Sequence, residues 1–275
     1  MKKDYRVIAL DMDGTVLNDQ KKITERTRLA IHRALAAGKE VVFCTGRAYS
    51  EMDEYLDEFS DMHYLCLESG ALIYDHQKKK PLQMSTIDTR TLKALEQATG
   101  GRDILVQIFS EGRSLLNRRH TGQLNRFFMS AYQELYEHSV TAVEDVFAYI
   151  RSSYSNVEKV NLYHTSPEER EITRKVLASL QLPLIIVDSE ITSLECTPPG
   201  INKAFGLQNL CRILNITMEQ VIMVGDADND CAALKAAGLS VAMGNAQPYI
   251  RDLCDIQTAD NNHDGCAQII ETYLL

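Results

Sequence analysis

The sequence of 275 residues lacks an apolar run long enough to cross a membrane, and its first residues show no signal-peptide pattern. Basic clusters are scarce too: three consecutive lysines before Pro81 form the one conspicuous cluster, and the net charge is −9. We therefore expect no membrane and no nucleic acid among its partners. An anionic ligand would need a local cationic site, because the overall charge repels it.

Cysteines with metal-binding or redox spacing are also absent, since no two of the seven form a C-x-x-C pattern. Their number is odd, they are dispersed, and most lie in apolar surroundings. This pattern is typical of reduced core cysteines, so we expect a cytoplasmic protein without a disulfide framework. The seven are Cys44, Cys66, Cys196, Cys211, Cys231, Cys254 and Cys266.

Strands and helices alternate at both ends of the chain. Short apolar runs predict buried strands at residues 7–10, 40–44, 64–67, 221–224 and 240–243. Amphipathic segments predict helices at residues 24–37, 49–59, 203–214 and 230–237. Strand–helix–strand alternation with buried strands favours a parallel sheet covered by helices.

The middle of the chain has a different pattern, in which helices are mixed with strands and hairpins. Helices are expected at residues 88–98 and 166–180, and a polar, aromatic segment between them is also helix-like. Strands are expected at residues 104–110, 114–117, 157–163, 184–188 and 193–197. The mixture predicts an α+β domain at residues 85–189, inserted into a core domain formed by residues 1–84 and 190–275.

Three of the apolar strands end in polar clusters. These are the sequences DMDGT at residues 11–15, TGR at 45–47 and GDADND at 225–230. In an open parallel sheet the ligand site lies beyond the carboxyl ends of the strands. We therefore expect the three clusters to converge in space although they are far apart along the chain.

The first cluster suits phosphoryl chemistry. Asp11 and Asp13 are two residues apart, so in an extended segment they point the same way. One carboxylate can attack phosphorus, while the other protonates the leaving oxygen and later deprotonates water. Gly14 allows a turn in which backbone N–H groups approach an anion. A capped turn after a strand is the simpler alternative for this motif alone.

The third cluster would bring Asp226 and Asp230 to the same sheet edge. Two carboxylates about 4 Å apart repel by roughly 4 kcal/mol at an effective dielectric near 20. Several carboxylates together therefore need a cation, and oxygen ligands beside a phosphate favour Mg²⁺. For Asp230, an acid at the start of a helix is an equally common role, and both roles are compatible.

Cationic and hydrogen-bonding partners for a phosphate are present as well. Thr45 offers a hydroxyl and a backbone N–H at the end of a strand. Lys203 opens a helix just after Pro198-Pro199-Gly200, a rigid turn that would direct its side chain. The alternative for Lys203 is a surface lysine on a helix.

In this order the motifs resemble those of the haloacid dehalogenase superfamily, in particular its Cof-like phosphatase branch. The resemblance rests on DMDGT, TGR, the lysine that follows ECTPPGIN, and GDADND, with later matches at residues 243–246 and 258–265. It covers nearly the whole chain. It implies an α/β fold with a Rossmann-like parallel-sheet core and an inserted α+β cap domain.

The resemblance also implies roles for individual residues. Asp11 would be the nucleophile that forms an aspartyl-phosphate, and Asp13 the general acid and then the general base. Mg²⁺ would be held by the Asp11 carboxylate, the Asp13 backbone carbonyl and Asp226, with Asp230 in support. The phosphoryl oxygens would be bound by the backbone at Met12 to Gly14 and by Thr45, Gly46, Lys203 and Asn229. Arg47 would contact the substrate or form a structural ion pair.

The function implied is a Mg²⁺-dependent phosphatase for small phosphorylated metabolites, working as a monomer or a small homo-oligomer. Sugar phosphates, nucleotides and phosphorylated cofactors are the expected substrates. Two positions depart from the pattern: Ser69 stands where this branch usually has Asn, and Asp228 is an additional acid that we expect to face solvent.

Two alternatives stay open. A phosphomutase would use the same nucleophile and retain the phosphoryl group. A non-catalytic sensor of a phosphorylated ligand is the alternative outside catalysis, but such a protein should have lost Asp13 or Lys203, and both are present.

Overall fold

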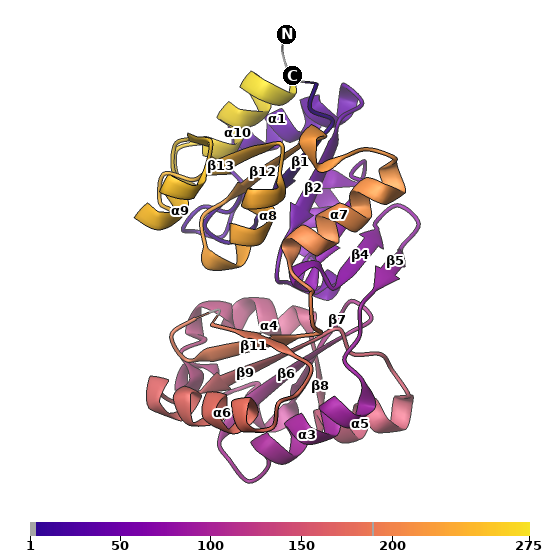
Figure 1. The fold of residues 1–275 in the computed structure, drawn as a ribbon, viewed down its shortest axis with the longest axis vertical. Coiled ribbons are helices and arrows are strands. Elements are labelled where there is room, and N and C mark those ends of the chain that lie inside the picture. The colour runs from indigo at the N-terminus through magenta and orange to yellow at the C-terminus, as the bar shows by residue number, and fades with distance from the viewer. Residues whose placement is uncertain (1–3, 189) are drawn as a thin grey trace. The chain divides into compact units, whose positions relative to one another are not determined.

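The computed structural model describes residues 4–188 and 190–275, which form two compact units with a sheet each (Figure 1). Unit 1 comprises the residues up to Gly46, Tyr55–Gln83 and Asn202–Leu275. Unit 2 comprises Arg47–Glu54 and Met84–Ile201. No helix in the described part of the chain is long and apolar enough to span a membrane.

The sheet of unit 1 has eight strands. They are β1 (Val7–Leu10), β2 (Glu40–Cys44), β3 (Tyr64–Leu67), β4 (Leu72–Asp75), β5 (Lys80–Met84), β12 (Val221–Gly225), β13 (Leu239–Ala242) and β14 (Ile256–Gln257). Their spatial order is β14-β13-β12-β1-β2-β3-β4-β5. The run from β14 to β3 is parallel, whereas β3 and β4 are antiparallel.

Helices lie on both faces of this sheet (Figure 1). On one face α1 packs against α10, and on the other α7 packs against α8. The helices of this unit are α1 (Glu25–Ala36), α2 (Asp53–Leu56, which straddles the division), α7 (Lys203–Leu214), α8 (Cys231–Ala236), α9 (Pro248–Leu253) and α10 (Gly265–Ile269). Buried strands between two helical layers explain why β1 and β12 are apolar throughout.

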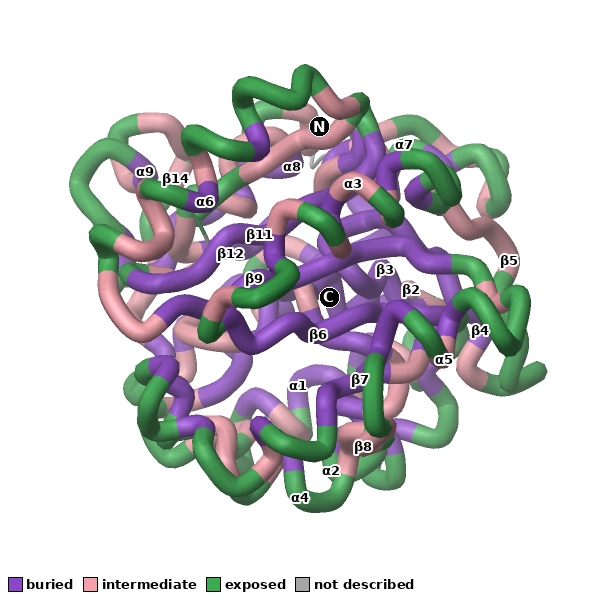
Figure 2. Tube along the Cα trace, turned by 90° about the horizontal axis from the view of Figure 1, so that it is seen from below, coloured by how far each residue is buried: buried purple, intermediate pink, exposed green. Residues whose placement is uncertain are grey.

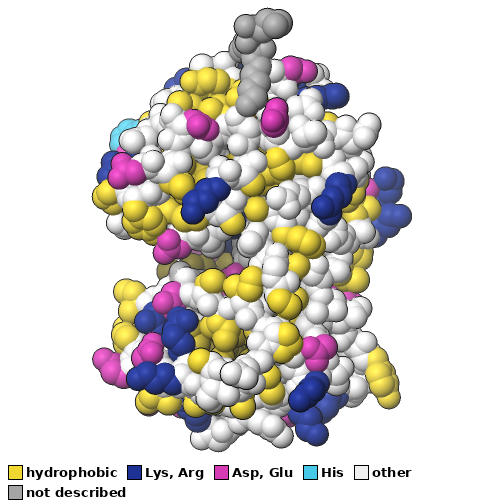
Figure 3. Space-filling model, viewed as in Figure 1, with side chains coloured by type: hydrophobic (Ala, Val, Ile, Leu, Met, Phe, Trp, Pro, Cys, Tyr) yellow, Lys and Arg dark blue, Asp and Glu magenta, His cyan; other side chains and the backbone are white. Residues whose placement is uncertain are grey.

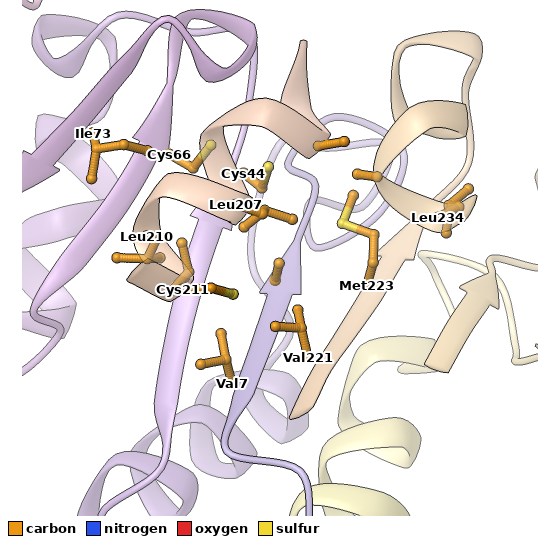
Figure 4. Packing of buried hydrophobic residues seen from close by; sticks show 14 of the residues in the cluster. Val7, Cys44, Cys66, Ile73, Leu207, Leu210, Cys211, Val221, Met223 and Leu234 are labelled. Atoms are coloured by element: carbon orange, nitrogen blue, oxygen red, sulfur yellow. The ribbon is translucent and has the colours of Figure 1, made fainter. Parts of the chain in front are cut away.

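The core under α7 is built from alternate residues of the central strands. Val7 of β1 and Val221 of β12 face Leu207, Leu210 and Cys211 of α7 (Figure 4). Burial is concentrated in the strands and the inward sides of the helices (Figure 2). At about 25 cal/mol per Å² of apolar surface, this burial is the main term that stabilises the unit.

The sheet of unit 2 has six strands in the order β10-β11-β9-β6-β7-β8. All neighbouring pairs are antiparallel except β7 and β8, which are parallel. The strands are β6 (Ile104–Ser110), β7 (Arg113–Asn117), β8 (Val140–Val143), β9 (Lys159–His164), β10 (Ile185–Val187) and β11 (Ser193–Thr197). The helices are α3 (Thr89–Thr99), α4 (Gln133–Ser139), α5 (Val146–Ser153) and α6 (Pro167–Ser179).

The two faces of this second sheet differ. One face carries Val106 and Leu162 and packs on α3, α5 and α6 in an apolar core. The opposite face mixes apolar residues such as Leu105 with polar ones such as Gln107 and Lys159. Period-two alternation along β6 and β9 produces this division.

The predicted fold class is confirmed: a parallel α/β core sheet is accompanied by a second, mixed sheet. One predicted element is wrong. Residues 49–59 do not form one helix but a 3₁₀ turn at Tyr49–Glu51, the short α2, and a second 3₁₀ turn at Asp57–Phe59. The break has a packing reason, since residues up to Glu54 pack with unit 2 and the later ones with unit 1.

Strand β11 pairs with β9 and β10, so contacts place it in unit 2. The predicted domain boundary at residue 190 precedes β11 and would therefore assign that strand to the core domain. The five residues of β11 are too few for the sequence to indicate which sheet the strand joins. As domain boundaries, residues 84 and 190 stay a prediction.

Candidate active site

The carboxyl ends of β1, β2 and β12 lie side by side in unit 1. Leu10, the last residue of β1, pairs with Phe43 of β2 on one side and with Val224 of β12 on the other. Asp11, Thr45 and Asp226 therefore leave the sheet at the same edge, as the strand-end argument predicted.

A buried cluster of charges joins the first and third motifs through Lys203. The Lys203 ammonium donates to Asp11 Oδ1 at 2.5 Å and to Asp230 Oδ1 at 2.6 Å. Its side chain is fully buried, which excludes the surface-lysine alternative. Asn202 caps the helix that Lys203 begins, because its side chain accepts from the Phe205 N–H.

Asp230 hydrogen-bonds both to the lysine and to the loop after β12. Its Oδ1 accepts from Lys203, and its Oδ2 accepts from the backbone N–H groups of Asp226 and Ala227. The loop after β12 is thereby fixed with the Asp226 carboxylate beside Asp11. Gly225 makes this possible, because a Cβ there would lie 2.5 Å from the Asp230 carboxyl carbon.

Carboxylate oxygens of Asp11, Asp226 and Asp230 lie within 4.8 Å of one another, and they form a group that can hold a metal ion. Thr15 donates to Asp226 Oδ1 at 2.8 Å and so orients that carboxylate. Three hard anionic donors face one ammonium group, Lys203. The donor set therefore fits a divalent cation with a preference for oxygen ligands.

The electrostatics point the same way. Burial and the Asp230 charge together raise the pKa of Asp226 to about 6, against the Thr15 hydrogen bond, which lowers it. Burial also raises the pKa of Asp11, an effect that Lys203 opposes. Burial acts to lower the pKa of Lys203, but Asp11 and Asp230 outweigh it and raise that pKa. Carboxylates that are hard to ionise without a cation are what a metal site requires.

The loop after β1 turns at Gly14. Its φ is +81°, and a Cβ there would lie 2.5 Å from Asp226 Oδ2, so glycine is required both for the backbone and for the approach. Asn245 donates to the Gly14 carbonyl at 2.8 Å and holds the turn from outside.

Asp13 is half-buried, and its carboxylate pairs with Lys21 at 2.7 Å. It is not a member of the acidic group formed by Asp11, Asp226 and Asp230. Its charge nevertheless acts on Asp226, whose pKa it helps to raise, so the convergence of Asp13 with the other three carboxylates stays a prediction. The side chain of Asp13 points to a lysine that follows in the same loop region.

The remaining predicted residues occupy varied environments. Met12 and Thr45 are buried, Gly46 is half-buried, and Asn229 is half-buried with an Oδ1 that has no hydrogen-bond partner among the described residues. Arg47 is buried and belongs to unit 2. The roles predicted for all of these residues stay predictions.

Asp228 is exposed, as expected, and accepts a hydrogen bond from the Tyr249 hydroxyl at 2.7 Å. Sequence reasoning gave no role to Thr15, Lys21 or Tyr249. Thr15 belongs to the DMDGT motif, so its place there was an available signal. Lys21 and Tyr249 carry no such signal, because only the folded loops bring them to Asp13 and Asp228.

These features define an α/β protein whose parallel sheet ends at a buried centre of aspartates and one lysine. A family model described as haloacid dehalogenase-like hydrolase matches residues 8–270. The chain therefore belongs to the haloacid dehalogenase-like hydrolase family, and it is a phosphatase of this family. The resemblance and the enzyme class predicted from the sequence are confirmed.

Curated relatives have similar lengths. The 5-amino-6-(5-phospho-D-ribitylamino)uracil phosphatase YcsE of Bacillus subtilis is 29% identical, over 99% of this chain and 97% of the relative. Phosphatase YwpJ of the same organism is 28% identical, over 98% of this chain and all of the relative.

Among solved structures, a haloacid dehalogenase-like hydrolase from Bacteroides thetaiotaomicron superposes with a TM-score of 0.85 at 25% identity. The alignment covers 97% of this chain and 98% of that chain. The fold described above is therefore a known one for this family.

Proposed function

We propose that the chain is a Mg²⁺-dependent phosphatase that hydrolyses small phosphorylated metabolites through an aspartyl-phosphate on Asp11. The proposal rests on one observation, the buried contact of Lys203 with Asp11 and Asp230 beside Asp226. A carboxylate fixed by an ammonium group at the edge of a parallel sheet is positioned to attack an incoming phosphoryl group.

In the first step, an Asp11 carboxylate oxygen attacks phosphorus, and the bond from phosphorus to the leaving oxygen breaks. Asp13 donates a proton to that oxygen. Lys203 holds Asp11 Oδ1, fixes the orientation of the carboxylate, and offsets the negative charge that collects at the transition state. Thr45, Gly46, Asn229 and the backbone at Met12 to Gly14 bind the phosphoryl oxygens.

In the second step, water attacks the phosphorus of the aspartyl-phosphate, and the bond to Asp11 breaks. Asp13 accepts the proton of the water, and inorganic phosphate leaves. Because Asp13 pairs with Lys21 at 2.7 Å, it must exchange this partner to transfer protons. Its half-exposed position allows the exchange, since a surface ion pair contributes only about 0–1 kcal/mol.

Mg²⁺ would be held by the Asp11 carboxylate, the Asp13 carbonyl and Asp226, while Asp230 and Thr15 orient the loop. When bound, it supplies charge neutralisation between the carboxylates and the phosphoryl group. The pKa of Asp226 near 6 supports a cation at this place, because ionisation of the carboxylate is otherwise opposed by burial.

The substrate class proposed is a sugar phosphate, a nucleotide or a phosphorylated cofactor. The name of one relative, a phosphatase of a phosphoribitylamino uracil, supports this class.

The test is release of p-nitrophenol and phosphate from p-nitrophenyl phosphate with Mg²⁺ and then with excess EDTA. We expect turnover with Mg²⁺ and its loss with EDTA. Asp11→Asn should abolish turnover, while the control Asp228→Asn, an exposed acid near the same site, should retain it. Undiminished turnover in Asp11→Asn would contradict the proposal that Asp11 is the nucleophile.

A phosphomutase is the nearest alternative enzyme. It would move the phosphoryl group between two positions of one sugar and release little phosphate. Parallel assays of phosphate release and of positional transfer on the same sugar phosphate distinguish a phosphatase from a phosphomutase. A protein that binds phosphorylated compounds with Mg²⁺ but neither hydrolyses nor transfers would be the sensor.

A further inference from the structure

A second charged site lies in unit 2 and shares no residue with the proposed active site. It is a pocket of about 410 Å³ at the turn before β6 and the segment after β7. Arg102, Arg119, Arg126 and His120 line it together with one acid, Asp103. Figure 3 shows a group of Lys and Arg side chains on the visible face of this unit.

Two of the arginines are held in place by neighbours. Arg102 donates to Glu169 Oε2 at 2.8 Å and to the Thr173 hydroxyl at 2.7 Å. Arg126 pairs with Asp103 and donates to Gln123 Oε1 at 2.7 Å. Fixed guanidinium groups lose little freedom when they bind an additional acceptor.

The third arginine differs from them. Arg119 is exposed and has no ion-pair or hydrogen-bond partner among the residues that the structure describes. Because Arg102 and Arg126 are paired with Glu169 and Asp103, the uncompensated positive charge at the pocket is that of Arg119. In a chain of net charge −9, such a local positive excess is unusual and attracts anions.

His120 adds an independent observation. It is 3% exposed, packs on Phe127 with ring centroids 5.3 Å apart, and lines the pocket. Its Nδ1 is buried and has no hydrogen-bond partner in the described part of the chain. Burial and the neighbouring Arg119 lower the pKa of His120 to about 4. A buried polar atom without a partner is costly unless a ligand or water supplies one.

We propose that this pocket binds a small anion with carboxylate or phosphate groups. The volume is that of a metabolite site, which typically measures about 300–1,000 Å³. The donors are of the kind that bind carboxylates and phosphates with two parallel hydrogen bonds. Arg119 supplies the uncompensated charge, Arg102 and Arg126 supply oriented donors, and His120 lies against the bound group.

The experiment is a calorimetric titration of the metal-free full chain with citrate, in the presence and absence of added salt. We expect saturable binding that weakens as salt rises. Arg119→Gln should weaken it at least about tenfold, because a charge-assisted hydrogen bond is lost. The matched control is Arg118→Gln: this neighbouring arginine is exposed, pairs with Glu144, and does not line the pocket.

Nitrogen-15 NMR of the histidine side chains gives a second readout. The resonance of His120 is the one that is missing in His120→Gln. Citrate should shift this resonance in the parent chain but not in Arg119→Gln. If Arg119→Gln binds citrate as the parent does, the proposal is wrong. It is equally wrong if Lys203→Met, still folded by circular dichroism, does not bind citrate, because the anion would then occupy the first unit.

Discussion

Lys203 is a fully buried cation between two carboxylates, so its charge matters to the fold as well as to chemistry. In Lys203→Met the carboxylates lose their partner, and breaking a buried pair costs about 3–5 kcal/mol. We expect a lower Tm and a loss of turnover of about 10²–10³-fold. Calorimetry and the p-nitrophenyl phosphate assay measure the two effects.

Lys235→Met is the control for this substitution, because Lys235 is exposed on α8 of the same unit. It should leave both quantities nearly unchanged. A Lys203→Met protein that keeps the activity of the parent would remove Lys203 from the site.

The Asp226 carboxyl predicts how pH and Mg²⁺ act together. Its pKa is about 6 in the folded chain against an ordinary value of 3.8, so the folded state holds this proton more tightly. The resulting stabilisation is full below about pH 4 and is lost as pH rises through 6. Mg²⁺ needs the ionised form, so it should raise Tm clearly at pH 7.5 and little at pH 5.

Differential scanning calorimetry with Mg²⁺ and with EDTA at the two pH values tests this. In Asp226→Asn the Mg²⁺ effect at pH 7.5 should disappear. An equal Tm gain at both pH values in the parent chain would contradict the role given to Asp226.

Several members of this site could be predicted from the sequence, because they follow apolar strands that end in a common edge. Asp11, Asp226 and Lys203 belong to sequence motifs from which a phosphoryl-transfer site can be predicted. The Lys21–Asp13 pair could not be predicted, since Lys21 lies in a polar loop where any of several side chains is equally plausible. Loop conformation, and not residue type, determines that contact.

At the scale of the element, the turn after β1 depends on Gly14. Gly14→Ala meets two obstacles, a backbone φ of +81° and the Asp226 carboxylate 2.5 Å from the added Cβ. Gly38 meets the backbone obstacle alone, because its φ is +73° and nothing lies within 4 Å of a Cβ there. We expect Gly38→Ala to lose about 1 kcal/mol of stability and keep its activity.

Gly14→Ala should lose more stability than Gly38→Ala and most of its turnover, since Asp226 must move. Urea unfolding and the phosphatase assay measure both variants in parallel. Matching turnover in the two variants would show that the close approach at Gly14 is not required.

The central strands β1 and β12 were predictable because they are fully buried and apolar. Helix α7 was predictable because its apolar face and its start after a Pro-Pro-Gly turn agree. The region 49–59 was not predictable. Its residues have helix-like spacing, but the segment is divided between two packing partners, and tertiary contacts override the local preference. Strand β8 was not predicted, because its four residues are only partly buried and lie in a mixed polar stretch.

At the scale of the whole molecule, unit 2 contains a buried ion pair of its own. Lys159 donates to Glu195 at 3.1 Å, with side chains 1% and 6% exposed, and its ammonium lies 4.2 Å from the centroid of the Phe109 ring. Lys159→Met should destabilise the unit by about 3–5 kcal/mol, because Glu195 is left charged and unpaired.

The double variant Lys159→Met/Glu195→Gln should recover part of this loss, since no buried charge then lacks its partner. Urea unfolding followed with probes in each unit is the measurement, because two units need not unfold together. Additive losses in the double-mutant cycle would mean that the two charges do not interact.

The strand order of the core sheet determines when its strands can pair during synthesis on the ribosome. Strand β1 pairs with β2 on one side and with β12 on the other, and Thr15 bonds to a carboxylate 211 positions later. Until β12 is synthesised, β1 has an open edge and the site lacks Asp226, which follows that strand. Unit 2 is complete in sequence before that point, so the nascent chain must carry an unfinished first unit while the second one folds.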